Sequence, residues 1–383
     1  MSHPVKAIII FANGHPCKAT TWSNVPSCIV RQLEQKDIHV YTVDLLCHPL
    51  QQCYDLVVRR ILRLLLLPLG IHPPYYVHTQ LHHWYAEQRI RNAVRRFSDA
   101  RCCLFFSYLF YNRYNTIPSL LLGDWPIPFD LQRKGRRPSF LDRRVIRQEE
   151  EAITHARHVV SVFRLRAKEM QRAYPTASIH FIDQLFVNNC YGVLPPADEI
   201  ISKKEQSDIL LFIGKADRYR HAAQQVVDAL ALLLREEPWR ALQLHVIGME
   251  DKSLTIPPAL PVVCHGYLDK DRREEHAEYY QLLMDARMII NPSPCWAAYS
   301  SLVEAMYFYT PVIVSPFDAF TDTFGQTIDF GCYTSSDTQQ LAGHIRYLCD
   351  TPNYPILCKH AHHHVKDNTC AHFVDKLIHL IQP

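Results

Sequence analysis

Short runs of consecutive apolar residues alternate along this chain with segments whose apolar residues recur at helical spacing. Residues 5–12 and 38–43 are two such runs, and a helical pattern covers residues 25–33 between them. Strands that are apolar throughout are typical of parallel sheets, because helices cover both of their faces. The repeated strand–helix–strand pattern therefore predicts an α/β fold with parallel sheets.

A break in this alternation predicts two domains. The chain has 383 residues, whereas a single hydrophobic core stops growing at roughly 250 to 300 residues. Pro195, Pro196 and a polar run precede a new series of strands and helices that begins at residue 208. We predict an N-terminal domain over 1–190, a C-terminal domain over 191–360, and a helix within 361–383 that can pack back toward the N-terminal domain.

The two halves of the chain differ in charge. Residues 1–190 contain 25 Lys and Arg against 14 Asp and Glu, a net +11, and the remainder contains 16 against 24, a net −8. A basic half favours an anionic partner. Two basic amphipathic helices are predicted within residues 55–101, and they can either lie on an anionic membrane surface or pack on their own domain. No recognised nucleic-acid module accompanies the charge, so we expect no nucleic acid as a partner.

Export signals and membrane spans are not expected. The apolar run 7–12 is too short for a secretory signal. The most apolar segment, residues 61–69, contains Arg63 and Pro68 and falls short of the roughly 20 residues that span a bilayer. The 13 cysteines are scattered, which favours reduced thiols. We expect a cytoplasmic protein, either free or peripheral on the inner face of the membrane.

A first group of candidate site residues follows a predicted strand over residues 210–213. Gly214, Lys215 and Arg220 stand where that strand ends and a helix begins. Ligands bind parallel sheets beyond the carboxyl ends of the strands, and the unpaired N–H groups of a helix start attract phosphate. The two cations are therefore predicted to hold a phosphate group, with a solvated surface loop as the alternative.

A second group lies at the start of a later predicted helix. Ser300 and Ser301 stand in its first turn, and Glu304 follows about one turn later. Hydroxyl and backbone donors at a helix start bind anions. The carboxylate of Glu304 can accept two vicinal hydroxyls of a ribose, and helix capping is its alternative role.

In their order and spacing, the two groups resemble the C-terminal domain of retaining glycosyltransferases of the GT-B fold, similar to glycosyltransferase family 4 (glycosyl transferases group 1). Lys215 and Arg220 match the two cations of that family with Lys and Arg exchanged, and Glu304-Ala305-Met306 followed by Thr310-Pro311-Val312 matches its second signature. The resemblance implies two Rossmann-like domains whose parallel sheets face each other across a cleft. It also implies that the two cations hold the donor diphosphate and that Glu304 binds the nucleotide ribose.

The resemblance assigns a set of residues to the donor side of the site. These are Gly14, Gly214, Lys215, Arg220, Gly248, Trp296, Ser300, Ser301 and Glu304. The donor is expected to be a sugar nucleotide, with a UDP-sugar favoured over a GDP-sugar. No further cofactor is expected, and no metal, because cationic side chains and a helix dipole can neutralise the leaving diphosphate. Asp269-Lys270-Asp271 spells a metal-binding DxD sequence, but its charged surroundings favour a solvated turn.

The chain departs from the family pattern in the loop before Ser300. Trp296 stands where the family has its first Glu, which binds the transferred sugar, and Ala297, Ala298 and Tyr299 stand in place of Gly-Phe-Gly. Trp296 can stack on a sugar face, or it can be a core residue. The missing glycines predict a stiffer loop.

Catalysis would depend on Lys215 and Arg220, and on Asp124 from a loop of the N-terminal domain. A turn-forming Asp beside Gly123 is the alternative for Asp124. Gly14 would let a ligand come close to the end of the first strand. We expect a retaining hexosyltransferase-type glycosyltransferase of polysaccharide biosynthesis that acts on a glycan or lipid-linked acceptor. The alternative is a catalytically impaired protein of the same fold that binds a glycan or partners another transferase.

Overall fold

The computed structural model describes residues 7–133, 135–182, 191–335 and 337–381, and it divides into two compact units. One unit comprises Met1–Gln184 and Cys370–Pro383, and the other comprises Leu185–Thr369. We call them the first and the second domain. The boundary predicted at residue 190 lies among residues 183–190, outside the described residues.

The first domain contains a parallel sheet of six described strands. β1 is buried at every position, as expected for a strand between two layers of helices. Across the sheet, the strand order is β2 (His39–Asp44), β1 (Ala7–Ala12), β3 (Cys102–Phe105), β4 (Ser119–Gly123), β5 (His158–Ser161) and β6 (Ile179–Phe181).

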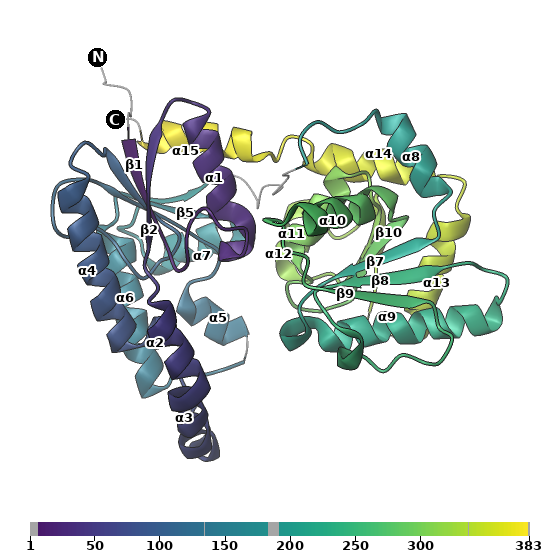
Figure 1. Cartoon of the computed structure of the whole chain (residues 1–383), viewed down its shortest axis with the longest axis horizontal. Coiled ribbons are helices and arrows are strands. Elements are labelled where there is room, and N and C mark those ends of the chain that lie inside the picture. Colours follow the sequence, from purple (N-terminus) through teal and green to yellow (C-terminus); the bar gives the residue numbers. More distant parts are fainter. Residues whose placement is uncertain (1–6, 134, 183–190, 336, 382–383) are drawn as a thin grey trace. The chain divides into compact units, whose positions relative to one another are not determined.

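Helices cover both faces of this first sheet (Figure 1). Ile90 and Ile153 pack with Phe11 in one apolar cluster. The helices are α1 (Val25–Glu34), α2 (His48–Cys53), the π-helix η2 (Tyr54–Val58), α3 (Arg59–Leu66), α4 (Gln80–Arg96), α5 (Ile127–Arg133), α6 (Phe140–His155), α7 (Arg164–Ala173), α15 (Cys370–Ile381) and the short 3-10 helices η1 (Thr21–Asn24), η3 (Leu67–Leu69) and η4 (Tyr76–His78).

The last helix of the chain, α15, packs on α1 of the first domain. It buries the apolar side chains of Phe373, Val374, Leu377 and Ile381. Lys36, just after α1, forms an ion pair with Asp375 at 2.6 Å. The first domain is therefore assembled from both ends of the chain.

The second domain repeats the architecture with another parallel sheet of six described strands. Phe212 and Val246 pack with Leu230 and Ile345 in its main apolar cluster. Across the sheet, the strand order is β12 (Gly331–Tyr333), β11 (Val312–Val314), β10 (Met288–Asn291), β7 (Ile209–Ile213), β8 (Gln243–Ile247) and β9 (Val262–Gly266). The predicted α/β fold with two parallel sheets is confirmed.

The helices of the second domain again lie on both faces of its sheet (Figure 1). They are α8 (Ala197–Glu205), α9 (Ala216–Glu236), α10 (Arg273–Asp285), α11 (Tyr299–Tyr307), α12 (Asp318–Phe324), α13 (Thr338–Asp350), α14 (Tyr354–Val365) and the 3-10 helix η5 (Asp251–Ser253).

Candidate functional site

The second sheet has one point where its strand order reverses. The chain runs outward from β7 through β8 to β9, then returns to β10 on the other side of β7 and continues to β11 and β12. In open parallel sheets, ligands bind outside the carboxyl ends of the strands at such a switch point. The first predicted group lies in the loop after β7 and the first turns of α9, and the second lies in the first turns of α11, after the loop that follows β10. The side-chain amide of Asn291 joins the two strands by donating to the carbonyl of Ile213 at 3.3 Å.

Two glycines pack against each other beside this point. The N–H of Gly214 donates to the carbonyl of Ile247 at 2.9 Å. Gly248 has a φ of +95°, and a Cβ placed on it would lie 2.7 Å from the carbonyl oxygen of Gly214. A side chain at Gly248 would thus be excluded both by backbone conformation and by space. Close packing around each residue explains why glycine occupies both positions. Contact of either glycine with a sugar-nucleotide donor stays a prediction.

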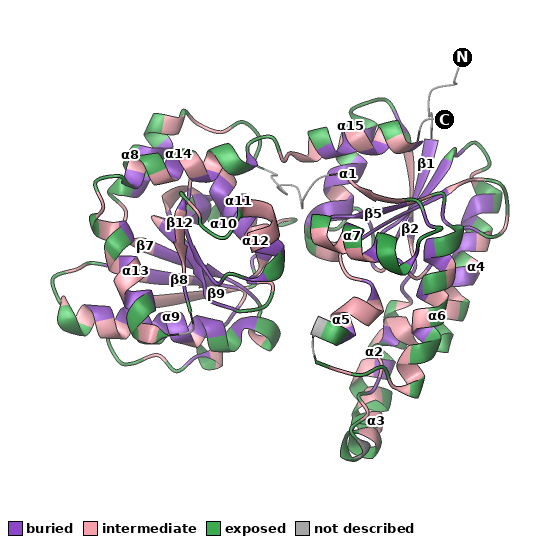
Figure 2. Ribbon diagram, turned by 180° about the vertical axis from the view of Figure 1, so that it is seen from behind, coloured by how far each residue is buried: buried purple, intermediate pink, exposed green. Residues whose placement is uncertain are grey.

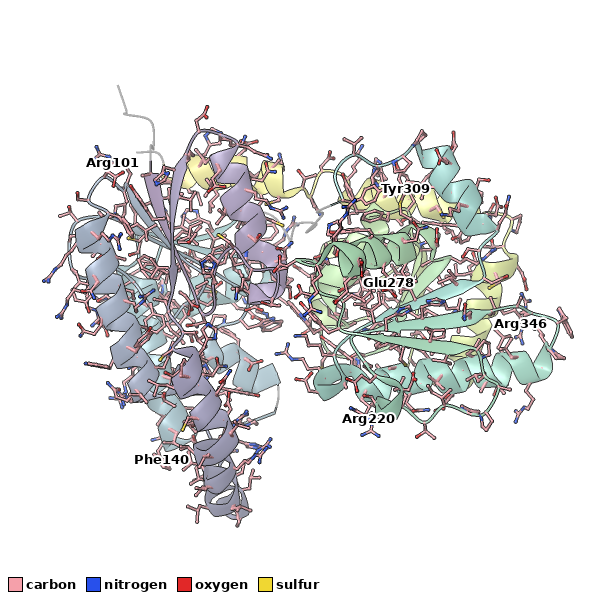
Figure 3. The ribbon with its side chains drawn as sticks, viewed as in Figure 1. Arg101, Phe140, Arg220, Glu278, Tyr309 and Arg346 are labelled. Carbon is pink, nitrogen blue, oxygen red and sulfur yellow. The ribbon has the colours of Figure 1, made fainter. Side chains whose placement is uncertain are left out.

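The two predicted cations stand at the start of α9. Lys215 is the N-cap residue, and its Nζ lies 5.3 Å from the ring centroid of Tyr267, just after β9. Burial raises the pKa of the Tyr267 hydroxyl. Arg220 is exposed on α9, and Figure 3 shows its side chain at the outer edge of the domain. Tyr267 was not singled out by sequence reasoning, although an aromatic residue directly after a strand at this sheet edge was a usable signal.

The loop between β10 and α11 has an unusual backbone. Trp296, Ala297 and Ala298 have φ values of +68°, +36° and +50°, in the left-handed region that favours glycine. These are the positions around the glycines of the family pattern, so the left-handed conformation occurs here without them. A similar run, Trp22-Ser23-Asn24, precedes α1 in the first domain.

The side chains predicted in this loop and helix are partly covered. Trp296 is half-buried and packs against the main apolar cluster of the second domain. Ser300 and Ser301 are half-buried in the first turn of α11, where the N–H of Ser301 donates to the carbonyl of Ala298 at 2.8 Å. Stacking of Trp296 on a sugar and phosphate binding by the two serines stay predictions.

Glu304 is buried and already fully hydrogen-bonded. Its Oε2 accepts from the hydroxyl of Tyr279 at 2.8 Å and from the Nζ of Lys270 at 3.0 Å. Its Oε1 accepts from the hydroxyl of Tyr280 at 3.0 Å and from the same Nζ at 3.2 Å. A carboxylate has about four acceptor positions, so a ribose would have to replace one of these donors. Lys270 is the partner that sequence reasoning had placed in a solvated turn.

The residues that flank Lys270 form a local turn. The N–H of Asp271 donates to Oδ1 of Asp269 at 3.0 Å, and the N–H of Asp269 donates to Oε2 of Glu275 at 2.6 Å. Among the described residues, no group of three or more His, Cys, Asp or Glu side chains is placed to hold a metal ion.

None of the described helices has the length and apolar character needed to cross a membrane.

The Thr-Pro-Val signature is tied to a buried lysine. Nζ of Lys204, on α8, donates to Oγ1 of Thr310 at 2.9 Å and to the carbonyls of Leu283 and Ala286, at the end of α10, at 2.6 Å and 2.9 Å. Burial lowers the pKa of Lys204 to about 7. Tyr309, where the family has glycine, keeps a left-handed φ of +60°. This cluster holds α8 and α10 to the strand that follows α11.

The remaining two predicted site residues lie in the first domain. Gly14 follows β1 at the switch point of the first sheet, has a φ of +111°, and donates its N–H to Oδ1 of Asp44 at 2.9 Å. Asp124 follows β4, and its Oδ1 accepts from the N–H of Trp125 at 2.9 Å. That hydrogen bond belongs to a turn beside Gly123, and a catalytic role for Asp124 stays a prediction.

Comparison with known protein families finds a match within the second domain. Residues 207–351 match the model of the family described as glycosyl transferases group 1. No curated protein matches the chain by sequence.

Solved structures of similar fold cover almost the whole chain. Sucrose-phosphate synthase from Thermosynechococcus elongatus is 15% identical, with a TM-score of 0.67 over 97% of this chain and 97% of that one. HepE from Anabaena, solved with UDP-glucose, is 12% identical, with a TM-score of 0.63 over 97% and 98%. A glycosyltransferase from Rickettsia africae is 13% identical, with a TM-score of 0.62 over 99% and 98%. The likeness establishes the fold, and the predicted GT-B type with two Rossmann-like domains is confirmed.

Proposed function

We propose that this chain is a glycosyltransferase that moves a sugar from a nucleotide diphosphate donor to a glycan or lipid-linked acceptor. The match of residues 207–351 to the family described as glycosyl transferases group 1 supports this proposal. The observation that carries the proposal is the arrangement at the switch point of the second sheet. There, Lys215 and the start of α9 stand beside the loop that enters α11. A UDP-sugar is proposed ahead of a GDP-sugar, and the similar HepE structure contains UDP-glucose.

The proposed chemistry is electrostatic. When the bond between the anomeric carbon and the diphosphate breaks, negative charge grows on the leaving oxygen. Lys215, Arg220 and the positive end of α11, with Ser300 and Ser301, would stabilise that charge without a metal. The acceptor hydroxyl oxygen forms the new bond to the anomeric carbon with retention of configuration, and the hydroxyl proton passes to the departing diphosphate. Asp124 and Gly14 would act from the first domain, and no further cofactor is proposed. The proposed location is the cytoplasm.

Glu304 is proposed to hold the ribose of the donor. Its carboxylate is bound by Lys270, Tyr279 and Tyr280, so the ribose hydroxyls would take the place of the Lys270 ammonium. This exchange keeps the number of hydrogen bonds to the buried carboxylate unchanged. Loss of a donor without replacement would be costly, because a buried carboxylate oxygen would be left unpaired. Gly248, at the end of the neighbouring strand β8, is proposed to contact the nucleotide through its backbone.

Donor binding is tested by thermal shift with UDP, GDP, their glucose and mannose derivatives, and pyrophosphate. A ligand at 100 times its dissociation constant stabilises the folded state by about 2.7 kcal/mol. We expect UDP compounds to shift the transition most and Lys215→Ala to remove the shift. Arg235→Ala, which removes an exposed cation from the far end of the same helix, is the matched control and should keep it. A nucleotide shift that survives Lys215→Ala would refute this site.

A second candidate function is that of a non-catalytic partner, which binds a glycan or another transferase. Two observations favour it: Trp296 replaces the first Glu of the family pattern, and the carboxylate of Glu304 is fully engaged by protein donors. Release of UDP from a UDP-sugar in the presence of membrane extract separates the two. UDP release supports the enzyme, and tight nucleotide binding without release supports the partner protein.

A further inference from the structure

The first domain carries a helical arm formed by α2, η2 and α3, residues 48–66. Figure 1 shows this arm extending from one end of the first sheet. Tyr54 is the one buried residue of the arm, and α2 and α3 have none. A helix of a folded domain normally buries an apolar stripe, so α2 and α3 are exceptional among the α-helices that the structure describes.

Large apolar side chains crowd the exposed surface of the arm. Leu64 is 78% exposed and Leu65 63%, and Leu56, Val57 and Ile61 each exceed 50%. Figure 2 shows α3 in the colours of exposed and half-buried residues. Monomeric soluble proteins rarely expose so many neighbouring apolar side chains, and such a patch marks an interaction surface. We call these five residues the apolar ridge.

The side of the arm that faces its own domain is already packed. The hydroxyl of Tyr54 donates to the carbonyl of Pro74 at 2.9 Å, and the guanidinium of Arg59 stacks over the ring of Tyr75 at 4.2 Å. The segment around Pro74 thus supports one side of the arm and leaves the ridge without a partner from the described residues of the domain. Folding of this domain does not account for the ridge.

The charges beside the ridge are predominantly positive. Arg60 and Arg63 are exposed on α3, and residues 56–67 contain no acidic residue. The one acidic side chain of the arm, Asp55, lies 4.0 Å from Arg59. A second basic helix, α4, behaves differently: it buries Ile90 and Val94, and its Arg89 donates to the carbonyl of Asp44 at 3.2 Å. Of the two basic helices predicted from the sequence, α4 packs on its domain and α3 does not.

We propose that the apolar ridge of η2 and α3 docks on an anionic phospholipid bilayer, with Arg60 and Arg63 on the lipid phosphates. An apolar face flanked by arginines lies in the plane of a membrane, with the side chains at the boundary between headgroups and acyl chains. The absence of acidic residues from positions 56–67 and the +11 charge of residues 1–190 favour an anionic surface over a neutral apolar groove. The docking is independent of the proposed sugar transfer.

The test is co-sedimentation of the full chain with vesicles of phosphatidylcholine alone or mixed with phosphatidylglycerol. We expect binding to the anionic vesicles that weakens as salt rises. The triple variant Ile61→Gln, Leu64→Gln, Leu65→Gln should bind at least roughly tenfold more weakly at unchanged charge, and so should Arg60→Gln with Arg63→Gln. In the variant Leu64→Trp, the fluorescence of the added indole should shift to the blue on binding.

Two matched controls test whether the arm itself is responsible. Arg95→Gln with Arg96→Gln removes the same charge from exposed positions of α4, and Ile356→Gln removes an exposed apolar side chain from the second domain. Both should bind vesicles like the unaltered chain. Because the substituted positions are exposed, all variants should keep their melting temperature. Equal binding by the triple variant would overturn the proposal, and so would a dimer in light scattering that the triple variant dissociates.

Discussion

The stability of the first domain depends on pH through the buried side chain of His82. His82 is fully buried on α4, its Nε2 lies 3.1 Å from Oδ1 of Asn13, just after β1, and its ring packs against those of Tyr76 and Phe110. Burial lowers the pKa of His82 to about 4. A histidine in an unfolded chain has a pKa near 6.5. Between about pH 4 and pH 6.5, His82 is therefore protonated in the unfolded chain and neutral in the folded domain.

The free energy of unfolding should therefore fall as the pH drops from about 6.5 toward 4. At pH 5 the contribution of His82 amounts to roughly 2 kcal/mol relative to pH 7. The variant His82→Gln, which keeps an amide beside Asn13, should lose this part of the acid sensitivity. Urea denaturation of both proteins at pH 7 and pH 5 measures it, and equal losses of stability in the two would contradict the assignment.

Single residues also mark where sequence reasoning stops. The position of Glu304 about one turn into a helix followed from its spacing to Ser300, and the structure places it there. Its partners Lys270, Tyr279 and Tyr280 are 24 to 34 residues away in the sequence. No local pattern reports such a contact, because it depends on how α10 and the turn before it pack against α11. Lys270 was therefore interpreted as part of a solvated turn.

At the scale of elements, the loop that enters α11 stores backbone strain. Ala297 and Ala298 hold left-handed conformations that cost an L-residue roughly 1 kcal/mol each and cost glycine little. We expect Ala298→Gly to stabilise the second domain by up to about 1 kcal/mol, which raises the melting temperature of a domain of this size by roughly 2 to 4 °C.

The matched comparison for this substitution is Ala305→Gly within α11. There, glycine should lower stability, by roughly 0.5 to 1 kcal/mol from backbone entropy alone. Differential scanning calorimetry of both variants shows directly whether each substitution raises or lowers the melting temperature. If both substitutions destabilise the domain, the loop is not strained by its alanines.

The strands were the elements that the sequence predicted best. The runs at 5–12 and 38–43 became β1 and β2. β1 is buried at every position, because helices cover both faces of a parallel sheet, whereas β2 lies at the sheet edge and is mostly half-buried. β3 ends at Phe105, and the apolar side chains of Phe106 and Tyr108 that follow it are buried although they are not part of the strand. The two basic helices predicted within residues 55–101 are present as η2 with α3 and as α4. α3 ends at Leu66, just before Pro68, because proline cannot continue the hydrogen-bond ladder.

At the scale of the whole molecule, the chain passes from the first domain to the second and back again. A chain that ends at Thr369 would lack α15 and expose the surface of α1 that it covers. Four buried apolar side chains would be lost, a loss on the order of 5 kcal/mol from the stability of the first domain. The second domain should keep its fold, because it is complete by Thr369.

Hydrogen exchange distinguishes the two domains in this experiment. The amides of β1 should exchange faster in the shortened chain, and those of β7 should exchange as before. Lys36→Ala, which removes the ion pair with Asp375 and leaves α15 in place, is the control and should change exchange little, because exposed ion pairs contribute at most about 1 kcal/mol. Unchanged protection of β1 in the shortened chain would show that α15 is not part of that domain's stability.

The return of α15 to α1 sets an order for events on the ribosome. Synthesis delivers β1 and α1 before the second domain, and the helix that covers α1 only after it. The second domain, whose residues lie between, can close before the first one does. During translation, the surface of α1 that α15 later covers therefore stays exposed until α15 has been synthesised. In this interval a chaperone could bind to that apolar surface.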